Sequence, residues 1–94
     1  MNVRRVLLDV DKAVARPSLI ELARAIEAVE SVAALNITVT EIDIETLGMD
    51  VTIEGEALDY DRLVDAIESA GAVVHSIDEI VVGSRIVECV RRRR

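Results

Sequence analysis

The chain repeats one pattern of secondary structure, because a strand, a helix and a second strand are predicted twice in succession. The first set runs from about Val3 to Ile44, and the second runs from about Met49 to Val82. Apolar residues at every second position mark the strands, and apolar residues at helical spacing mark the helices. A βαββαβ order leaves few possible folds, while it places little limit on the chemistry.

The first half begins with a strand near residues 3–10 and continues into a helix with a recognisable start. Val6, Leu8 and Val10 form the apolar face of the strand. Ser18 and Glu21 stand at capping-box spacing, so a helix should begin there. The apolar stripe of this helix consists of Leu19, Leu22, Ala23, Ile26 and Val29. We expect the stripe to cover one face of the sheet.

The second strand changes its alternation part-way along. Apolar residues occupy odd positions from Leu35 to Val39, whereas Ile42 and Ile44 occupy even positions. A β-bulge near Thr40 or Glu41 would return both sets to one face. In the alternative interpretation, the two isoleucines face something else, such as another subunit. The sequence favours neither interpretation.

The second half repeats the arrangement of the first. A hairpin is predicted at residues 45–48, and a strand follows it. The inward residues of that strand are Met49, Val51 and Ile53. Asp59 is a good N-cap for a second helix, and Gly71 suits the left-handed position after its last turn. Residues 73–82 form the fourth predicted strand.

Two right-handed βαβ crossovers joined by a hairpin produce an α+β fold, the ferredoxin-like plait. We therefore predict a four-stranded antiparallel sheet with the first and third strands in its centre and both helices on one face. The other face has no helix to cover it. The residues predicted on that face include Leu7, Thr38, Thr40 and Thr52. Partner subunits or ligands are the natural cover for such a face.

The chain divides into one acidic domain, residues 1–90, and a basic C-terminal tail, residues 91–94. The formal net charge is −7, and the tail consists of four arginines, so residues 1–90 alone carry −11. An acidic body repels phosphate backbones, and no nucleic-acid partner is predicted. We expect the tail to be a solvated end, although it could dock on an acidic neighbour, a nucleic acid or an anionic surface.

The sequence predicts neither a membrane anchor nor a disulfide. The longest uninterrupted apolar run is residues 32–35, which is too short to cross a membrane. Cys89 is the only cysteine, so no internal disulfide can form. Because no export signal is recognised either, the predicted location is the reducing cytoplasm.

No group of residues forms a convincing catalytic site. Residues 75–79 contain an acid, a base and a nucleophile, but neighbours on a strand point to opposite faces. His75 therefore cannot readily activate Ser76, and its parity with Val73 and Ile77 predicts a hydrogen-bonded, half-buried histidine. A pair of nearby thiolates, aromatic platforms for RNA and a glycine-rich phosphate loop are also missing. We predict a protein that is not an enzyme and has no cofactor.

Carboxylates are the remaining candidates for a binding site, because they recur at alternate positions on two strands. The alternating sets are Asp9 and Asp11, then Glu41, Asp43 and Glu45. Calcium needs several oxygen ligands at about 2.3 to 2.6 Å, and alternation brings together two at most from one strand. A second strand or subunit must complete any site.

The candidate ligands for a divalent cation such as calcium are Asp9, Glu41, Asp43, Asp78 and Glu79. Solvation or salt bridges at an interface are the alternative role for these residues.

Six short motifs are specific when they are taken together. They are Leu8-Asp9-Val10, Asn36-Ile37-Thr38, Glu41-Ile42-Asp43, Val51-Thr52-Ile53-Glu54-Gly55, Leu58-Asp59-Tyr60 and His75-Ser76-Ile77-Asp78-Glu79. The chain thereby resembles a small, uncharacterised archaeal family, catalogued as domain of unknown function 211. The resemblance extends from Val3 to about Glu88, with the arginine tail outside it. It implies a ferredoxin-like domain, an archaeal source and a ring-like homo-oligomer, and it brings no established activity or catalytic residues.

A weaker similarity is to amino-acid-sensing regulatory domains of the ACT type, which share the βαββαβ order. Those domains often enter their first helix with Pro-Gly-Leu, where this chain has Pro17-Ser18-Leu19. Serine in place of glycine removes the close backbone approach that such a ligand loop uses. This difference weakens the interpretation as an amino-acid sensor.

The sequence thus predicts a cytoplasmic binding or assembly module that associates with copies of itself. A sensor of a divalent cation or small ligand, bound at subunit interfaces, is the alternative. The segment from Ile86 to Val90 is apolar without a helical period. We predict that it packs on a neighbour or adds a strand to a neighbour's sheet.

Overall fold

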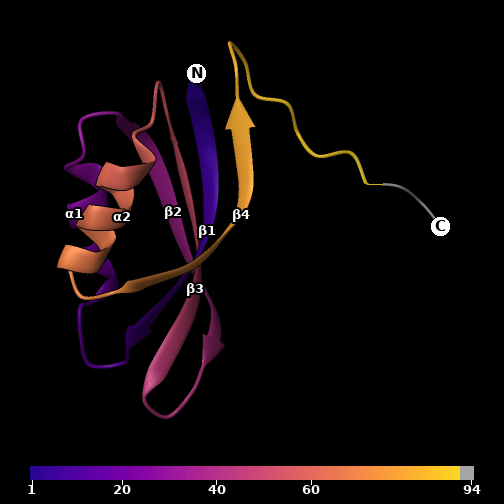
Figure 1. The fold of residues 1–94 in the computed structure, drawn as a ribbon. Helices are drawn as coiled ribbons and strands as arrows, with labels where there is room; N and C mark the ends of the chain where they lie inside the picture. Colours follow the sequence, from indigo (N-terminus) through magenta and orange to yellow (C-terminus); the bar gives the residue numbers. More distant parts are fainter. Residues whose placement is uncertain (92–94) are drawn as a thin grey trace.

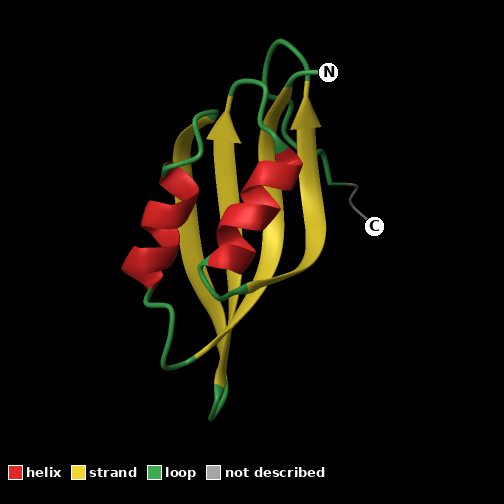
Figure 2. Cartoon of the chain, turned by 60° about the vertical axis from the view of Figure 1, so that its left-hand side comes forward, coloured by secondary structure: helices red, strands yellow, loops and turns green. Residues whose placement is uncertain are grey.

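The computed structural model describes residues 1–91, and its elements follow the predicted order (Figure 1). They are β1 (Val3–Ala13), α1 (Leu19–Glu27), β2 (Val32–Ile42), β3 (Thr46–Gly55), α2 (Tyr60–Ser69) and β4 (Val73–Val82). The strands form an antiparallel sheet in the order β2-β3-β1-β4, so the first and third strands are central. Both helices lie on one face of the sheet (Figure 2). The predicted ferredoxin-like fold is confirmed. Residues 92–94 of the predicted tail lie outside the described residues.

The core lies between the sheet and the helices. Ten apolar side chains have no exposed surface, and they are Val6, Leu8, Val10, Leu22, Ile26, Met49, Val51, Ile53, Leu63 and Ile67. The period of each predicted strand or helix places every one of these residues on its inward face. None of the helices in residues 1–91 is long and apolar enough to span a membrane.

Both helices begin at the predicted caps. The Ser18 hydroxyl accepts a hydrogen bond from the Glu21 N–H, and the Glu21 carboxylate accepts one from the Ser18 N–H, each at 3.1 Å. The bond from the Ser18 backbone favours the charged carboxylate and lowers the pKa of Glu21. Asp59 caps α2 by accepting from the Arg62 N–H. Gly71 follows α2 with a φ of +106°, the left-handed conformation predicted for it.

The turn between β2 and β3 comes earlier than predicted. Residues 43–45 form the turn, and residues 46–48 already belong to β3. The Asp43 N–H donates to the Thr46 carbonyl at 2.9 Å, which continues the pairing of the strands to the edge of the turn. The prediction of a turn at residues 45–48 is wrong because Gly48, a residue type common in turns, pairs within the sheet.

Of the two interpretations left open by the sequence, the β-bulge in β2 is present. The register of β2 against β3 shifts between Val39 and Glu41, so Thr40 is the extra residue. The hairpin extends past the helices (Figure 1), and Ile42 and Ile44 are therefore 76% and 91% exposed. These two isoleucines lie outside the core. Their contact with another subunit stays a prediction.

Candidate functional site

The face of the sheet opposite the helices, termed the open face, carries mainly polar side chains. The register places Leu7 of β1 opposite Thr52 and Glu79, and it places Asp50 opposite both Asp9 and Thr38. Opposite residues on neighbouring strands project from the same face. Among the described residues, only the C-terminal arm, residues 84–91, lies on this side (Figure 1). The prediction of an uncovered polar face is confirmed for residues 1–91.

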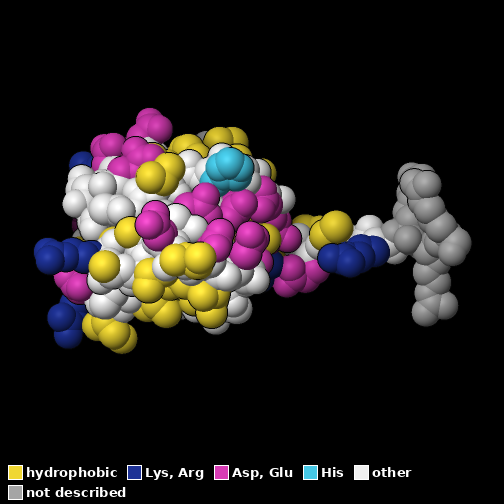
Figure 3. All heavy atoms as spheres, turned by 90° about the horizontal axis from the view of Figure 1, so that it is seen from below, with side chains coloured by type: hydrophobic (Ala, Val, Ile, Leu, Met, Phe, Trp, Pro, Cys, Tyr) yellow, Lys and Arg dark blue, Asp and Glu magenta, His cyan; other side chains and the backbone are white. Residues whose placement is uncertain are grey.

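An acidic groove of about 400 Å³ lies at the hairpin end of the open face. Its lining residues are Asp9, Asp11, Thr40, Glu41, Asp43, Thr46, Gly48, Asp50, His75 and Asp78. Figure 3 views the molecule from this end and shows acidic side chains gathered beside the chain's one histidine. Six carboxylates in one groove produce a strongly negative local potential.

Two bulges in β4 bring His75 and Asp78 to the acidic groove. Two of the three register shifts between β1 and β4 leave an extra residue in β4, and these two residues are the ones left unpaired. The Ser76 hydroxyl donates a 2.7 Å hydrogen bond to the Asp78 carboxylate, so the two side chains lie together. His75 is exposed, and the prediction that it is half-buried is wrong. Its strict alternation with Val73 and Ile77 does not hold across the bulges.

Four of the five predicted cation ligands line the acidic groove, namely Asp9, Glu41, Asp43 and Asp78. The fifth, Glu79, lies instead 3.6 Å from the Arg5 guanidinium. Asp11 and Asp50 also line the groove and were not among the five. Asp11 follows Asp9 at the period of a strand, which was a usable signal. Asp50 could be placed only with the register that sets it opposite Asp9.

These carboxylates do not converge within one chain. Among residues 1–91, no three His, Cys, Asp or Glu side chains are close enough together to hold a metal ion. Asp9 and Asp50 stand directly opposite each other on β1 and β3. Like charges in this arrangement destabilise a sheet, and a bound cation would relieve their repulsion. Such a cation would need further oxygen ligands from a second molecule.

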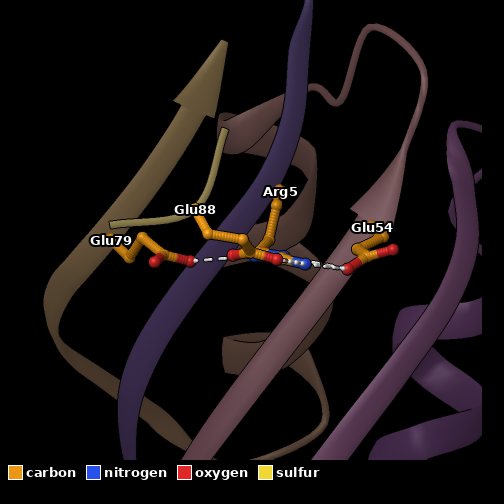
Figure 4. Close-up of polar contacts among 4 residues, drawn as sticks. All are labelled: Arg5, Glu54, Glu79 and Glu88. Carbon is orange, nitrogen blue, oxygen red and sulfur yellow. Dashed lines mark hydrogen bonds and ion pairs between the residues drawn. The ribbon is translucent and has the colours of Figure 1, made fainter. Parts of the chain in front are cut away.

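Arg5 ties the C-terminal arm to the opposite end of the open face (Figure 4). Its guanidinium donates hydrogen bonds to Glu88 at 2.6 Å and to Glu54 at 2.8 Å, and Glu79 lies 3.6 Å away. The bond to Glu88, followed by the bond to Glu54, raises the pKa of Arg5 further above its ordinary value. The same hydrogen bond from Arg5 lowers the pKa of Glu88. An ion pair therefore fastens the arm to β1.

Acidification should release the arm only below the ordinary pKa of glutamate. Because Arg5 lowers the pKa of Glu88, the contribution of this pair is fully present above about pH 4.3 and is lost as the pH falls through the lowered pKa. NMR resonances of the Ile86 and Val87 methyl groups, followed during an acid titration, should report the release. The Glu88→Gln variant should show the released resonances already at neutral pH. Identical resonances in the variant and the unchanged protein would show that the pair does not hold the arm.

The fold and the open face define a class, the ferredoxin-like domains whose sheet leaves one polar face uncovered. Residues 4–94 match the family of domain of unknown function 211, described as uncharacterized ArCR. The chain is also 44% identical over 90 residues to an uncharacterized protein of the archaeon Methanocaldococcus jannaschii, an alignment that covers 96% of this chain and 92% of that protein. The chain belongs to this family, as the resemblance indicated. The match reaches residue 94, so the prediction that the arginine tail lies outside the family is wrong.

Proposed function

We propose that the protein is a non-enzymatic module whose copies assemble with one another in the cytoplasm. The observation that carries this proposal is a set of apolar side chains that the chain leaves uncovered, each at least 42% exposed. They lie on β4, at the hairpin and on the arm, and are Val73, Ile77, Ile80, Val82, Ile42, Ile44, Val87 and Val90.

The edge strand β4 is the strongest part of this surface. Ile77 and Ile80 pair with Leu8 and Val6 of the buried core, yet they are 43% and 52% exposed because β4 borders the sheet. Covering such side chains contributes about 25 cal/mol for each Å² removed from water. The outer backbone groups of an edge strand also offer hydrogen bonds to a second chain. A domain of this size buries only about two-thirds of its unfolded surface, which increases the benefit of association.

Other observations support the remaining parts of the proposal, which are the lack of catalysis, the cytoplasmic location and the choice of partners. The Ser76 hydroxyl bonds to Asp78, an arrangement that does not prepare it as a nucleophile activated by His75. Cys89 is an exposed free thiol, which suits a reducing compartment. The acidic groove repels phosphate groups, and neither nucleic acids nor membranes are therefore among the partners that we propose.

Light scattering at micromolar concentration should give a mass several times the chain mass of 10.3 kDa. Replacing Ile77 and Ile80 with serine should raise the dissociation constant of the assembly at least about tenfold, through lost apolar burial. Ile20→Ser is the matched control, since Ile20 is 64% exposed on α1, on the far side from β4. A monomeric mass throughout the micromolar range would contradict the proposal.

A cation or small-ligand sensor is the second candidate, and the opposed carboxylates of the acidic groove favour it. If subunits complete a cation site there, millimolar calcium should raise the melting temperature. Replacing Asp9 and Asp50 with asparagine should abolish that rise and stabilise the protein without calcium, because the repulsion between them disappears. Asp61→Asn with Asp65→Asn on α2 is the matched control. Unchanged melting with calcium, magnesium and amino acids would favour assembly alone.

A further inference from the structure

We propose that the C-terminal arm of one copy docks on the open face of a second copy, with its arginines along the acidic groove. This inference rests on the proposed self-assembly and identifies one of its contacts. The open face of one molecule is then covered by the C-terminal arm of a second, identical molecule.

On its own chain the arm is poorly covered. Val87 and Val90 are 62% and 89% exposed, and the described end of the arm extends away from the rest of the domain (Figures 1 and 3). Arg91 forms no ion pair with any residue in the described part of the chain. The arm therefore presents apolar and basic groups that a second molecule can contact.

The charges of the arm and the open face are complementary. The tail carries four arginines, whereas residues 1–90 carry −11. The open face ends in a groove lined by six carboxylates. Attraction between the basic end of one copy and the acidic face of another would both speed their encounter and fix their orientation.

The spacing of charges along the arm matches the spacing along β1. Asp9 and Asp11 are four and six residues from Arg5, which corresponds to about 13 and 20 Å along a strand. Arg91 and Arg94 are three and six residues from Glu88, or about 10 and 20 Å in an extended chain. An arm whose Glu88 contacts Arg5 can therefore extend along β1 and reach both aspartates with its arginines.

The contact at Arg5 permits exchange between copies. Glu54 and Glu79 remain beside the guanidinium when Glu88 leaves, so Arg5 is not left without a carboxylate. Glu88 is 69% exposed in its own contact, and such solvent-exposed pairs are weak. The Glu88 of a second copy can replace it and form the same bonds. The exchange then offers acidic partners to Arg91, which forms no ion pair among the described residues of its own chain.

Cys89 provides a direct test, because it follows Glu88 in the arm. In a Thr52→Cys variant, the new thiol lies on the open face opposite Leu7. Mild oxidation of this variant at assembling concentration should produce covalently linked multimers that disappear on reduction. An internal disulfide in a monomer would show that the arm docks on its own chain, and the absence of linkage would show that it does not dock there. Either result would overturn the proposal.

Three control proteins show whether the disulfide linkage requires both the Thr52→Cys thiol and Cys89. The unchanged protein measures linkage between two Cys89 thiols, and Thr52→Cys combined with Cys89→Ser measures linkage without the arm. Asp61→Cys places the thiol on α2, on the covered side of the sheet. Multimers should be abundant only in the Thr52→Cys protein that retains Cys89.

Charge variants test independently whether the arm of a second copy occupies the open face. Replacing Arg91 to Arg94 with serine should weaken assembly at least about tenfold, since the attraction between the tail and the carboxylates of the acidic groove is lost. Asp9→Asn with Asp11→Asn should weaken it in the same direction, and combining both changes should add little. Glu27→Gln with Asp61→Asn removes two charges from the helices and should have no such effect. If the serine variant assembles as strongly as the original protein, the docking of the arm is refuted while self-assembly stands. If the original protein is itself monomeric, the self-assembly on which the docking rests is refuted.

Discussion

Replacing Gly55 with alanine should lower the free energy of unfolding by at least about 2 kcal/mol, because a methyl group has no room at this position. A Cβ there would overlap the Ser31 carbonyl oxygen and would lie 2.8 Å from the Leu58 side chain. The Leu58 side chain can rotate, but Ser31 is backbone next to Val32, which pairs with Gly55 itself. The start of β2 must therefore move. Urea denaturation followed by circular dichroism should show the loss.

Gly48→Ala is the matched control for this substitution. Gly48 lies in the same strand, and the nearest atom to its added Cβ would be the Cβ of Glu41 at 3.3 Å. Glu41 is exposed and stands beside the bulge of β2, where a small displacement disturbs no buried packing. We expect a change well below that of Gly55→Ala. Equal midpoints for the two variants would show that the contact with Ser31 is accommodated without cost.

The core and the order of elements could be predicted because apolar alternation is a local signal. A residue such as Val51 is inward in β3 whatever strand lies beside it, and its exposed fraction is 0%. The bulge in β2 was also local, since the apolar residues change parity after Val39. Helix caps at Ser18 and Asp59 depend only on residues within three positions.

The acidic groove depends on strand pairing, and its composition could be predicted only in part. The inward residues of β4 are Val74, Ile77 and Ile80, at intervals of three in place of two, which signals the two bulges. Other apolar residues on the same strand, such as Val73 and Val82, hide that signal. The strict alternation that predicts a half-buried His75 is therefore one that β4 does not follow.

The contact between Arg5 and Glu88 had no sequence signal at all. The two residues are 83 positions apart, and charged residues that could pair with Arg5 occur throughout the chain. Tertiary structure selects Glu54, Glu79 and Glu88 because β3, β4 and the arm converge beside β1. This selection also explains why Glu79 is absent from the acidic groove.

Deleting residues 86–94 should reduce the assembly towards the monomer while the domain remains folded. The six helices and strands of residues 1–91 end by Val82, and Arg5 keeps Glu54 and Glu79 when Glu88 is removed. The deletion takes away the exposed valines of the arm together with the arginine tail, so it removes both apolar and charged contacts with a neighbour. Light scattering should show the fall in mass, and circular dichroism should show unchanged secondary structure.

The outcome separates the two surfaces that could hold copies together. If the shortened protein keeps its assembled mass, the arm is dispensable and the edge of β4, with Ile77 and Ile80, must supply the main contact. If the mass falls after this deletion but not after replacement of the four arginines, the valines of the arm provide the attachment and the acidic groove does not. A loss of mass in both variants, with folded domains in each, is the result expected when an arm crosses to a neighbour and its arginines meet Asp9 and Asp11.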